Sequence, residues 1–516
     1  MDELEGHWPY PAVLTQSVKA YPVVQVMPRV GPQHTSAWPR AMSSRVTAWR
    51  DRIGGPTTNQ IYVHVPFCPF ICHFCPLYKV QTPRERTDTS KDQFVRSLLS
   101  EIDLWAATPA MRDVEFHSIY LGGGTPTELT ADQLGLILAA LRRRFRVAPD
   151  AEITLEGVAR QMLADDYMAA LVGHGVNRIS FGIQSLDVVL RRKIGRGDAI
   201  EDYAQIFETA RRRWPGLSIN TEIMAGLPEQ SLESLEADLD QLIAWAPNSL
   251  DVLYYVLMPG TKLQRLVSLG RRREPRHGEA LLRAREMINR KLQTAGYAQL
   301  TGEVFVRDDR DLFTRASFGG SPHRLNTVLA LGPSGFGLVE GTAYQNVPDL
   351  AAYNAAIARG LLPTERAERL TLPTARRRAQ LFSLLQLEAD PRVFDRARDR
   401  SLVSRWRTLG LVEDHAGTTR VTARGALWYN HLQMDVLPLR DLVRTLGMFG
   451  SLAEQRRASK QRFDDLPEHR RELVQIIRGH GWRGRFRYAA YRAYLRLASL
   501  TRRDRGALGF TGPVVE

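Results

Sequence analysis

Apolar, β-branched segments alternate with amphipathic segments between residues 59 and 300 of this chain. Short apolar segments that are each followed by a helical pattern indicate parallel βα units rather than hairpins. Six such units predict an α/β fold with a partial, TIM-like (β/α)6 barrel, in which the chemistry lies at the carboxyl ends of the strands. The predicted strands are residues 61–66, 118–122, 152–156, 178–184, 218–224 and 250–257.

Two of the intervening helices have clear signals in the sequence. Thr130 followed by Gln133 is a capping box, and it predicts a helix that runs to about residue 144. A second helix has one apolar stripe at helical spacing, which predicts a side that faces the core rather than a cofactor. The members of this stripe are Leu232, Leu235, Leu239, Leu242 and Ile243.

Changes in the pattern divide the chain into five predicted segments. The barrel is preceded by an irregular arm that is rich in proline, valine and tryptophan, and it is followed by a glycine-containing α/β region that completes it. A small, mostly helical domain with a winged-helix-like hairpin comes next, and a basic helical tail ends the chain. The predicted boundaries are 1–58, 59–300, 301–370, 371–439 and 440–516.

The composition limits the class of protein. A hydrophobic content of 44% and a charged content of 24% are typical of a soluble globular protein. No apolar run is long enough to cross a bilayer, and the first residues lack the pattern of a secretory signal. Three cysteines close together cannot form a disulfide framework, and an exposed metal cluster needs a reducing compartment. We therefore expect a cytoplasmic protein with no membrane partner.

The formal net charge of +14 raises the question of a nucleic-acid partner. However, arginine is spread along most of the chain, and no RNA-binding signature or base-reading helix is present. We interpret the charge as a solvated surface and expect no nucleic-acid partner.

All three cysteines of the chain lie in one stretch, residues 61–80. Cys68, Cys72 and Cys75 have the spacing C-x3-C-x2-C, which leaves one ligand missing for a structural zinc site or an electron-transfer cluster. Three thiols can instead hold three irons of a [4Fe–4S] cluster and leave the fourth iron open for chemistry. The alternative is three unrelated core cysteines, which such tight spacing argues against.

A glycine-rich segment, LGGGTPTEL at residues 121–129, follows the second predicted strand. Its glycines allow the backbone to approach a ligand closely and are expected to present unpaired amides to it. Alone, such a loop is weak evidence, because turns also use glycine. Because this loop follows the three cysteines by one βα unit, the two motifs together indicate a single site.

These motifs resemble those of the radical S-adenosylmethionine (SAM) superfamily. HVPFC with the following cysteines, LGGGTPT, VNRISFGIQS, INTEIMAGLPEQ and GYAQLTGEVFVRDD occur in the order found in the family of oxygen-independent coproporphyrinogen oxidase. The resemblance covers about residues 60 to 435. It implies a radical SAM barrel and a [4Fe–4S] cluster on Cys68, Cys72 and Cys75. It also implies two S-adenosylmethionine molecules, one of which is cleaved to a 5′-deoxyadenosyl radical.

The resemblance also implies which residues bind the nucleosides. Tyr62 matches a tyrosine beside the sulfonium, Phe74 an aromatic at the adenine, and Glu222 stands where the family has an aspartate. The full set of matching positions is Tyr62, Phe74, Gly123, Gly124, Thr125, Glu156, Gln184, Arg196, Glu222 and Phe336.

Several of these residues have an alternative, purely structural role. Glu156 is also explained as a capping or ion-paired carboxylate, and Gln184 as a partner of backbone groups. Arg196 lies in RRKIGR, which is also explained as a solvated basic face. Tyr62 and Phe74 are also explained as core aromatics.

Three positions depart from the porphyrin enzyme. Leu77 stands where the oxidase has a further cysteine, while Glu303 and Val304 replace its Asp-His pair. We therefore expect a one-carbon transferase, a methyltransferase or cyclopropanase, that acts on an sp2 carbon of a small-molecule natural product. The alternatives are coproporphyrinogen oxidation or other tetrapyrrole chemistry, and a heme chaperone, for which His323 and Asn326 are a loose match.

No catalytic base is identified in the sequence. The resemblance further implies a flavodoxin or ferredoxin as electron donor, and we expect a monomer.

Overall fold

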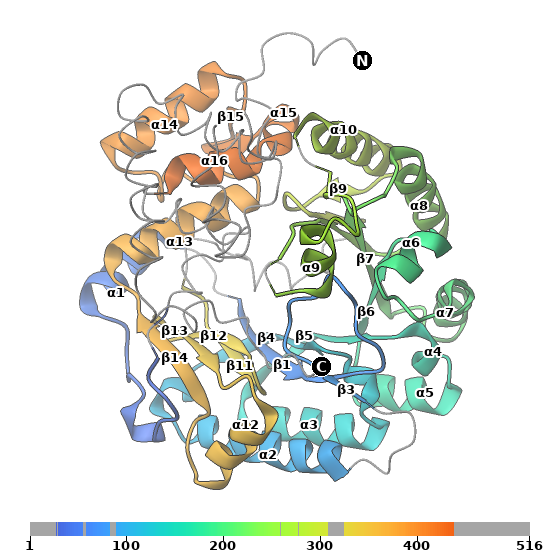
Figure 1. Cartoon of the computed structure of the whole chain (residues 1–516). Coiled ribbons are helices and arrows are strands. Elements are labelled where there is room, and N and C mark those ends of the chain that lie inside the picture. Colours follow the sequence, from blue (N-terminus) through green and yellow to red (C-terminus); the bar gives the residue numbers. More distant parts are fainter. Residues whose placement is uncertain are drawn as a thin grey trace.

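In the part of the chain that the structure describes, the central element is a 12-stranded sheet that contains a run of parallel strands from β1 to β8 (Figure 1). The structure is a computed structural model that describes residues 27, 29–54, 58–82, 89–258, 260–276, 278–307 and 325–437. The six parallel strands, in their order across the sheet, are β1 (Asn59–Val65), β4 (Glu115–Gly123), β5 (Arg146–Gly157), β6 (Arg178–Gln184), β7 (Ser218–Ala225) and β8 (Ser249–Tyr254). The predicted α/β fold with six parallel βα units is therefore confirmed.

The strands of the region after the barrel go to both edges of the sheet. On the β8 side, β10 (Val304–Val306) and β9 (Ala298–Gln299) add in antiparallel fashion. On the β1 side, β11 is parallel to β1, and three antiparallel strands follow. These strands are β11 (Val328–Leu331), β12 (Phe336–Val339), β13 (Thr342–Asn346) and β14 (Thr364–Arg369).

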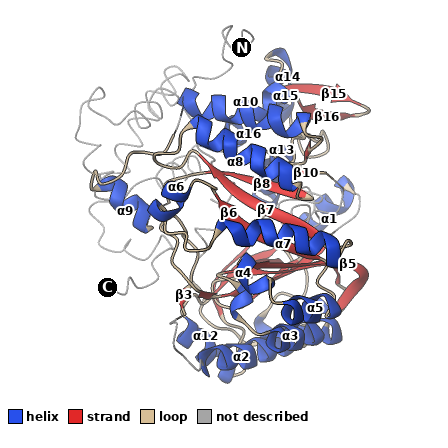
Figure 2. Ribbon diagram, turned by 90° about the vertical axis from the view of Figure 1, so that its right-hand side faces the viewer, coloured by secondary structure: helices blue, strands red, loops and turns tan. Residues whose placement is uncertain are grey.

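Helices cover the outer side of the sheet (Figures 1 and 2). The apolar outward-facing residues of the strands pack against them in one large core. These helices are α2 (Thr89–Ala106), α3 (Ala131–Arg144), α4 (Ala159–Met162), α5 (Asp165–Gly173), α7 (Ile200–Arg213), α8 (Leu232–Trp245), α10 (Gly278–Thr294) and α12 (Leu350–Ala358). Two further helices, α6 (Val188–Lys193) and α9 (Lys262–Ser268), instead pack in a smaller cluster with Phe74 of the cysteine loop.

The two predicted helix signals are confirmed. In α3 the Gln133 amide donates to the Thr130 hydroxyl (3.2 Å), while the Thr130 amide donates to the Gln133 side chain (3.0 Å). In α8 the stripe residues Leu235, Leu239 and Leu242 are buried. The strand at residues 250–257 was predicted too long, because the pairing of β8 with β7 ends at Tyr254.

A second core joins the N-terminal helix to the C-terminal helices. Its hairpin, β15 (Val412–His415) and β16 (Thr418–Val421), lies where the winged turn is predicted. The helices around it are α1 (Ser44–Ile53), α13 (Leu372–Leu385), α14 (Ala397–Thr408), α15 (Ala423–Leu427) and α16 (Tyr429–Val436).

Some predictions lie outside the described residues. They are the basic tail 440–516, the first half of the N-terminal arm, and His323. Within the described part of the chain, no helix is both long enough and apolar enough to cross a membrane.

A buried carboxylate ties α2 to the β11–β13 edge of the sheet. Glu101 accepts hydrogen bonds from the Gly332 amide (2.8 Å), the Asn346 side chain (2.8 Å) and the Tyr353 hydroxyl (2.6 Å). Burial raises the pKa of Glu101 from 4.5 to about 7, although these donors act in the opposite direction. The carboxylate thus orders the loop that precedes β12 at a cost in desolvation.

This raised pKa predicts a pH dependence of stability. The folded state holds the proton of Glu101 more tightly than the unfolded state, so the favourable contribution is complete below about pH 4.5 and is lost as the pH rises through about 7. The shift corresponds to about 3 kcal/mol. Urea unfolding at about pH 5 and about pH 8 should show a smaller pH difference for Glu101→Gln than for the parent. Glu208→Gln, at an exposed carboxylate of α7, is the control and should keep the parent difference.

Candidate active site

The three cysteines lie on the loop between the end of β1 and β3 (Val80–Gln81), at the carboxyl end of the parallel strands. Cys68 is buried in β2 (Phe67–Cys68), whereas Cys72 and Cys75 are partly exposed. Two donors point at their sulfurs: the Thr125 hydroxyl is 3.7 Å from Cys68 Sγ, and Arg196 Nη1 is 3.8 Å from Cys72 Sγ. The loop therefore presents thiols with hydrogen-bond donors beside them.

This donor set fits an iron–sulfur cube. The three thiols lie near one another, because, in addition to burial, the charges of Cys75 and Cys72 both act on the Cys68 thiol and raise its pKa. Three thiolates on one loop can each bind a different iron of a cube. Burial raises the pKa of Cys68 to about 12, so a cationic centre is needed to hold its thiolate.

The two histidines near the cysteines make different contacts. Both ring nitrogens of His64 are occupied, because they lie at the Tyr78 carbonyl (2.9 Å) and the Tyr62 hydroxyl (3.3 Å), and burial lowers its pKa to about 4. His64 therefore offers no fourth ligand. His73 Nδ1 lies 3.0 Å from the Lys193 carbonyl, and the Cδ2–Nε2 edge of its ring faces Gly195.

The glycine-rich loop packs directly on the cysteine loop. Gly124 and Thr125 donate their amides to the carbonyls of Val65 (2.8 Å) and Phe67 (2.6 Å), and Gly123 donates to Glu156 (3.0 Å). The expectation that these amides are unpaired is therefore wrong. The glycines are needed for close approach: a Cβ at Gly124 would lie 2.6 Å from the Phe67 carbonyl oxygen.

This contact predicts a strong effect of a small substitution. Gly124→Ala is expected to push the cysteine loop away, to reduce iron loading severely, and to destabilise the protein by about 1–3 kcal/mol. Iron and sulfide content after anaerobic reconstitution measures the first effect, and thermal unfolding measures the second. Gly173→Ala, in α5, is the matched control, because a Cβ there meets nothing within 4 Å. Normal iron loading in Gly124→Ala would contradict the packing argument.

Glu156, at the end of β5, is the anchor of the glycine-rich loop. Besides the Gly123 amide it accepts the Tyr120 hydroxyl (2.6 Å). Burial and, after it, the charge of the neighbouring Glu222 carboxylate raise the pKa of Glu156 to about 8. The structure thus brings Glu156 and Glu222 together, and Glu156 has a loop-holding role in addition to any role toward a nucleoside.

Gln184 and Arg196 lie on either side of α6. Gln184 ends β6 with a left-handed backbone (φ 69°), and its buried side-chain oxygen has no hydrogen-bond partner in the described part of the chain. A strained, buried and unsatisfied amide at a strand end is a functional-site signal. The Arg196 side chain is only 9% exposed and pairs with Asp198, so the alternative of a solvated basic face is wrong.

The predicted aromatic residues do not gather at one point. Tyr62 faces the barrel interior and stacks on Tyr120, with ring centroids 6.1 Å apart. Phe336 begins β12, three strands away from β4, and is 37% exposed. Phe74 is buried in a small apolar cluster under the cysteine loop with Leu190, Ile194, Leu227, Tyr255 and Leu263.

The C-terminal domain contacts the barrel at Glu303, one of the three positions that differ from the porphyrin enzyme. The Tyr429 hydroxyl of α16 donates to Glu303 (3.1 Å), and Arg285 of α10 lies over both the Tyr254 and Tyr429 rings. Val304 is buried in β10, and Leu77 is 46% exposed on the cysteine loop.

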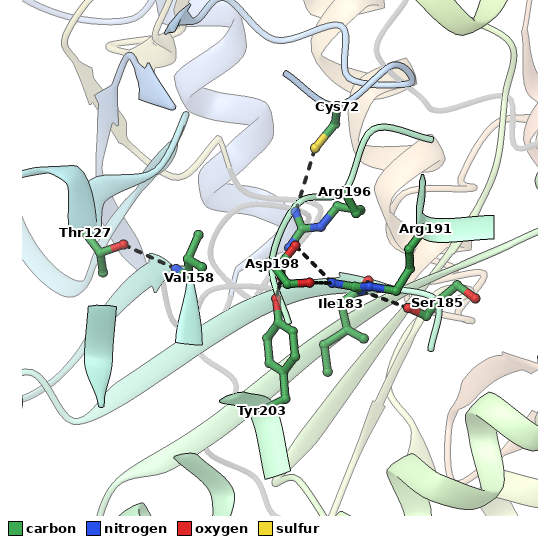
Figure 3. A network of polar contacts seen from close by, with 9 residues as sticks. All are labelled: Cys72, Thr127, Val158, Ile183, Ser185, Arg191, Arg196, Asp198 and Tyr203. Carbon is green, nitrogen blue, oxygen red and sulfur yellow. Dashed lines mark hydrogen bonds and ion pairs between the residues drawn. The ribbon is translucent and has the colours of Figure 1, made fainter. Parts of the chain in front are cut away.

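Several residues that support the predicted ones were not predicted from the sequence. Tyr120 donates its hydroxyl to Glu156. Arg191, Asp198 and Tyr203 contact Arg196 or the Ile183 carbonyl beside Gln184, as Figure 3 shows. The one available signal is the oppositely charged pair in Arg196-Gly197-Asp198. The other partners come from elements that only folding brings together.

Comparisons with known proteins agree with this geometry. Residues 62–242 match the model of the radical SAM superfamily. An oxygen-independent coproporphyrinogen III oxidase of Bradyrhizobium diazoefficiens is 30% identical over 335 residues, which are 63% of this chain and 72% of the relative. An anaerobilin synthase of Escherichia coli O157:H7 is 25% identical over 80% of this chain and 91% of its own.

A solved structure shows the same fold. Coproporphyrinogen III oxidase of Escherichia coli superposes with a TM-score of 0.61 and 25% identity, over 76% of this chain and 93% of its own. Fold and site thus define a radical SAM enzyme, whose cofactors are a [4Fe–4S] cluster and S-adenosylmethionine. Within this superfamily the chain belongs to the family of oxygen-independent coproporphyrinogen III oxidase.

Proposed function

We propose that the protein is a radical SAM oxidoreductase that acts on a tetrapyrrole, with a coproporphyrinogen as the first candidate substrate. The observation that carries this proposal is the breadth of the similarity to coproporphyrinogen III oxidases in both sequence and fold. The similarity to an anaerobilin synthase, over 80% of this chain and 91% of the relative, supports an enzyme over a chaperone. We therefore favour tetrapyrrole chemistry, which was the alternative drawn from the sequence, over the one-carbon transfer that was expected first.

The inner face of the barrel supports a substrate rich in N–H groups. Outward-facing strand residues are apolar and belong to the core, whereas the inward-facing ones are polar. Asn220 of β7 donates to Ser180 of β6 (2.9 Å) and to Asp251 of β8 (3.4 Å), which places these three side chains on one face. Glu222 is in register with Asp251. Carboxylates on this inner face accept hydrogen bonds, which suits the pyrrole N–H groups of a porphyrinogen.

In the proposed reaction the cofactors supply the radical, and the residues of the chain bind and position them. When bound and reduced, the cluster supplies one electron that cleaves S-adenosylmethionine and provides a 5′-deoxyadenosyl radical for hydrogen abstraction. Cys68, Cys72 and Cys75 would hold the cluster. Glu156 holds the glycine-rich loop against the cysteine loop through the Gly123 amide. The net charge of +14 favours the approach of a substrate with several carboxylates.

The test is an anaerobic assay of the reduced, cluster-loaded protein with S-adenosylmethionine and coproporphyrinogen III. We expect 5′-deoxyadenosine and a product that has lost propionate carboxyl groups as CO2, detected by mass spectrometry. 5′-Deoxyadenosine formation with no change in coproporphyrinogen, heme or another tetrapyrrole would overturn the substrate class and leave the radical chemistry in place.

One-carbon transfer is the second candidate, and the departures at Leu77 and Glu303 favour it. Under this proposal a second S-adenosylmethionine provides the carbon, and Gln184, Glu222 and Phe336 are candidates to bind it. Methyl-labelled S-adenosylmethionine would then give a labelled product together with S-adenosylhomocysteine. A flavodoxin or ferredoxin is the proposed electron donor in both cases, and we propose a monomeric, cytoplasmic enzyme.

A further inference from the structure

A single carboxylate, Asp198, lies between two buried arginines beside the cysteine loop (Figure 3). One of its oxygens is 2.6 Å from Arg196 Nη2, and the other is 3.0 Å from Arg191 Nη2. The side chains of Asp198, Arg191 and Arg196 are 1%, 4% and 9% exposed. Separating a buried ion pair costs free energy, because each partner is left as an uncompensated charge away from water. The three side chains are therefore held in this arrangement.

The Arg196 arm of this group ends at the cysteine loop. Arg196 Nη1 lies 3.8 Å from Cys72 Sγ, and the guanidinium stacks over the Phe70 ring at 4.9 Å. Tyr203 of α7 fixes the far side of the pair, because its hydroxyl contacts both Arg196 Nη2 (3.0 Å) and Asp198. The direction of the guanidinium is therefore set from α7, outside the cysteine loop.

The Arg191 arm ends at the tip of β6. Arg191 Nη1 donates to the carbonyls of Ile183 (2.7 Å) and Ser185 (2.9 Å), which flank Gln184. Gln184 has a backbone conformation that side chains rarely adopt, so an external contact is needed to hold it. Arg191 supplies this contact from α6.

We propose that Asp198 is a positioning residue with two effects. It holds the Arg196 guanidinium at the Cys72 sulfur, and through Arg191 it holds the end of β6 that carries Gln184. The inference rests on the proposed radical chemistry of this site. Hydrogen bonds and nearby charges at the sulfurs set the reduction potential of an iron–sulfur cluster. Asp198 thereby tunes the cluster without touching it.

The direction in which the cluster's midpoint potential shifts distinguishes two roles of Asp198: positioning Arg196, or acting only as a nearby negative charge. If Asp198 acts only as a nearby negative charge, its neutralisation makes reduction easier and raises the midpoint potential. If it holds Arg196 in place, neutralisation releases the guanidinium from Cys72, and the potential falls. The second result is the one expected.

The experiment is a spectroelectrochemical titration of the reconstituted full-length protein, without substrate and without S-adenosylmethionine. Asp198→Asn is expected to show a more negative midpoint potential than the parent, in the same direction as Arg196→Gln. Tyr203→Phe keeps every charge and removes one hydroxyl, so it tests the same arm if Asp198→Asn does not fold; a smaller fall is expected. The matched control is Asp390→Asn, a buried carboxylate of the C-terminal domain that pairs with Arg392 rather than with Arg191 or Arg196, and it should keep the parent potential.

Binding of S-adenosylmethionine to the cluster-loaded protein gives a second readout. Asp198→Asn should weaken binding by about 10- to 100-fold, as loss of supporting residues around metal sites does. A rise or no change in potential for Asp198→Asn, or an unchanged potential for Tyr203→Phe, would overturn the proposal. Because no tetrapyrrole is present, these outcomes are independent of whether the proposed substrate is correct.

Discussion

Replacing any one of Cys68, Cys72 and Cys75 by alanine is expected to reduce iron content to background and to lower S-adenosylmethionine cleavage by more than ~100-fold. The reason is that these are the chain's three cysteines, so no other thiol replaces a lost ligand. Iron and sulfide analysis, the visible spectrum and 5′-deoxyadenosine formation measure the effect.

The matched control for the cysteine variants is Thr125→Val. It keeps all three thiols and removes only the hydroxyl that lies 3.7 Å from Cys68 Sγ. We expect it to bind iron, since a hydrogen bond to sulfur adjusts the cluster rather than holding it. Cleavage that persists in one of the alanine variants would contradict the assignment of the cluster ligands.

Glu156→Gln is expected to weaken S-adenosylmethionine binding strongly while the cluster still loads. Glu156 accepts both the Gly123 amide and the Tyr120 hydroxyl, whereas a glutamine amide nitrogen has no lone pair for one of these donors. A buried donor left unsatisfied costs about 1–3 kcal/mol. That corresponds to roughly 5- to 150-fold in the dissociation constant. Isothermal titration of the cluster-loaded protein with S-adenosylmethionine measures it.

The control for Glu156→Gln is Tyr120→Phe. This variant removes one donor and leaves the Gly123 bond intact, so its effect on binding should be smaller. Equal loss in both variants would show that the tyrosine, rather than the glycine-rich loop, is what Glu156 supports.

Much of the fold was predictable because its signals are local. The strand 178–184 was predicted with the bounds that β6 has, and the capping box at Thr130 marked the start of α3. Side-chain periodicity and caps act over a few residues, so a single sequence contains them. The strands that flank the six βα units were not assigned, because pairing at a sheet edge depends on segments far apart along the chain.

The site was predictable only in part, for the same reason. Motif spacing predicted Cys72 as a ligand, and the family resemblance predicted Gln184 and Arg196 as site residues. The glycine-rich loop was misjudged, because the cysteine loop already uses its amides. Arg196 is buried rather than solvated because Asp198 and Tyr203 face it. Whether a charge in a basic run faces water depends on what packs against it.

The amino-acid sequence by itself determined the alternation of strands and helices, the three thiols and the order of the motifs, because each is a property of neighbouring residues. Only the tertiary structure decided which donors remain available and which charges meet. Asp198 joins Cys72, 126 positions earlier, to the tip of β6, and Tyr429 of the C-terminal domain reaches Glu303. Hydrogen bonds and ion pairs act over a few ångströms, so they are settled by packing rather than by order along the chain.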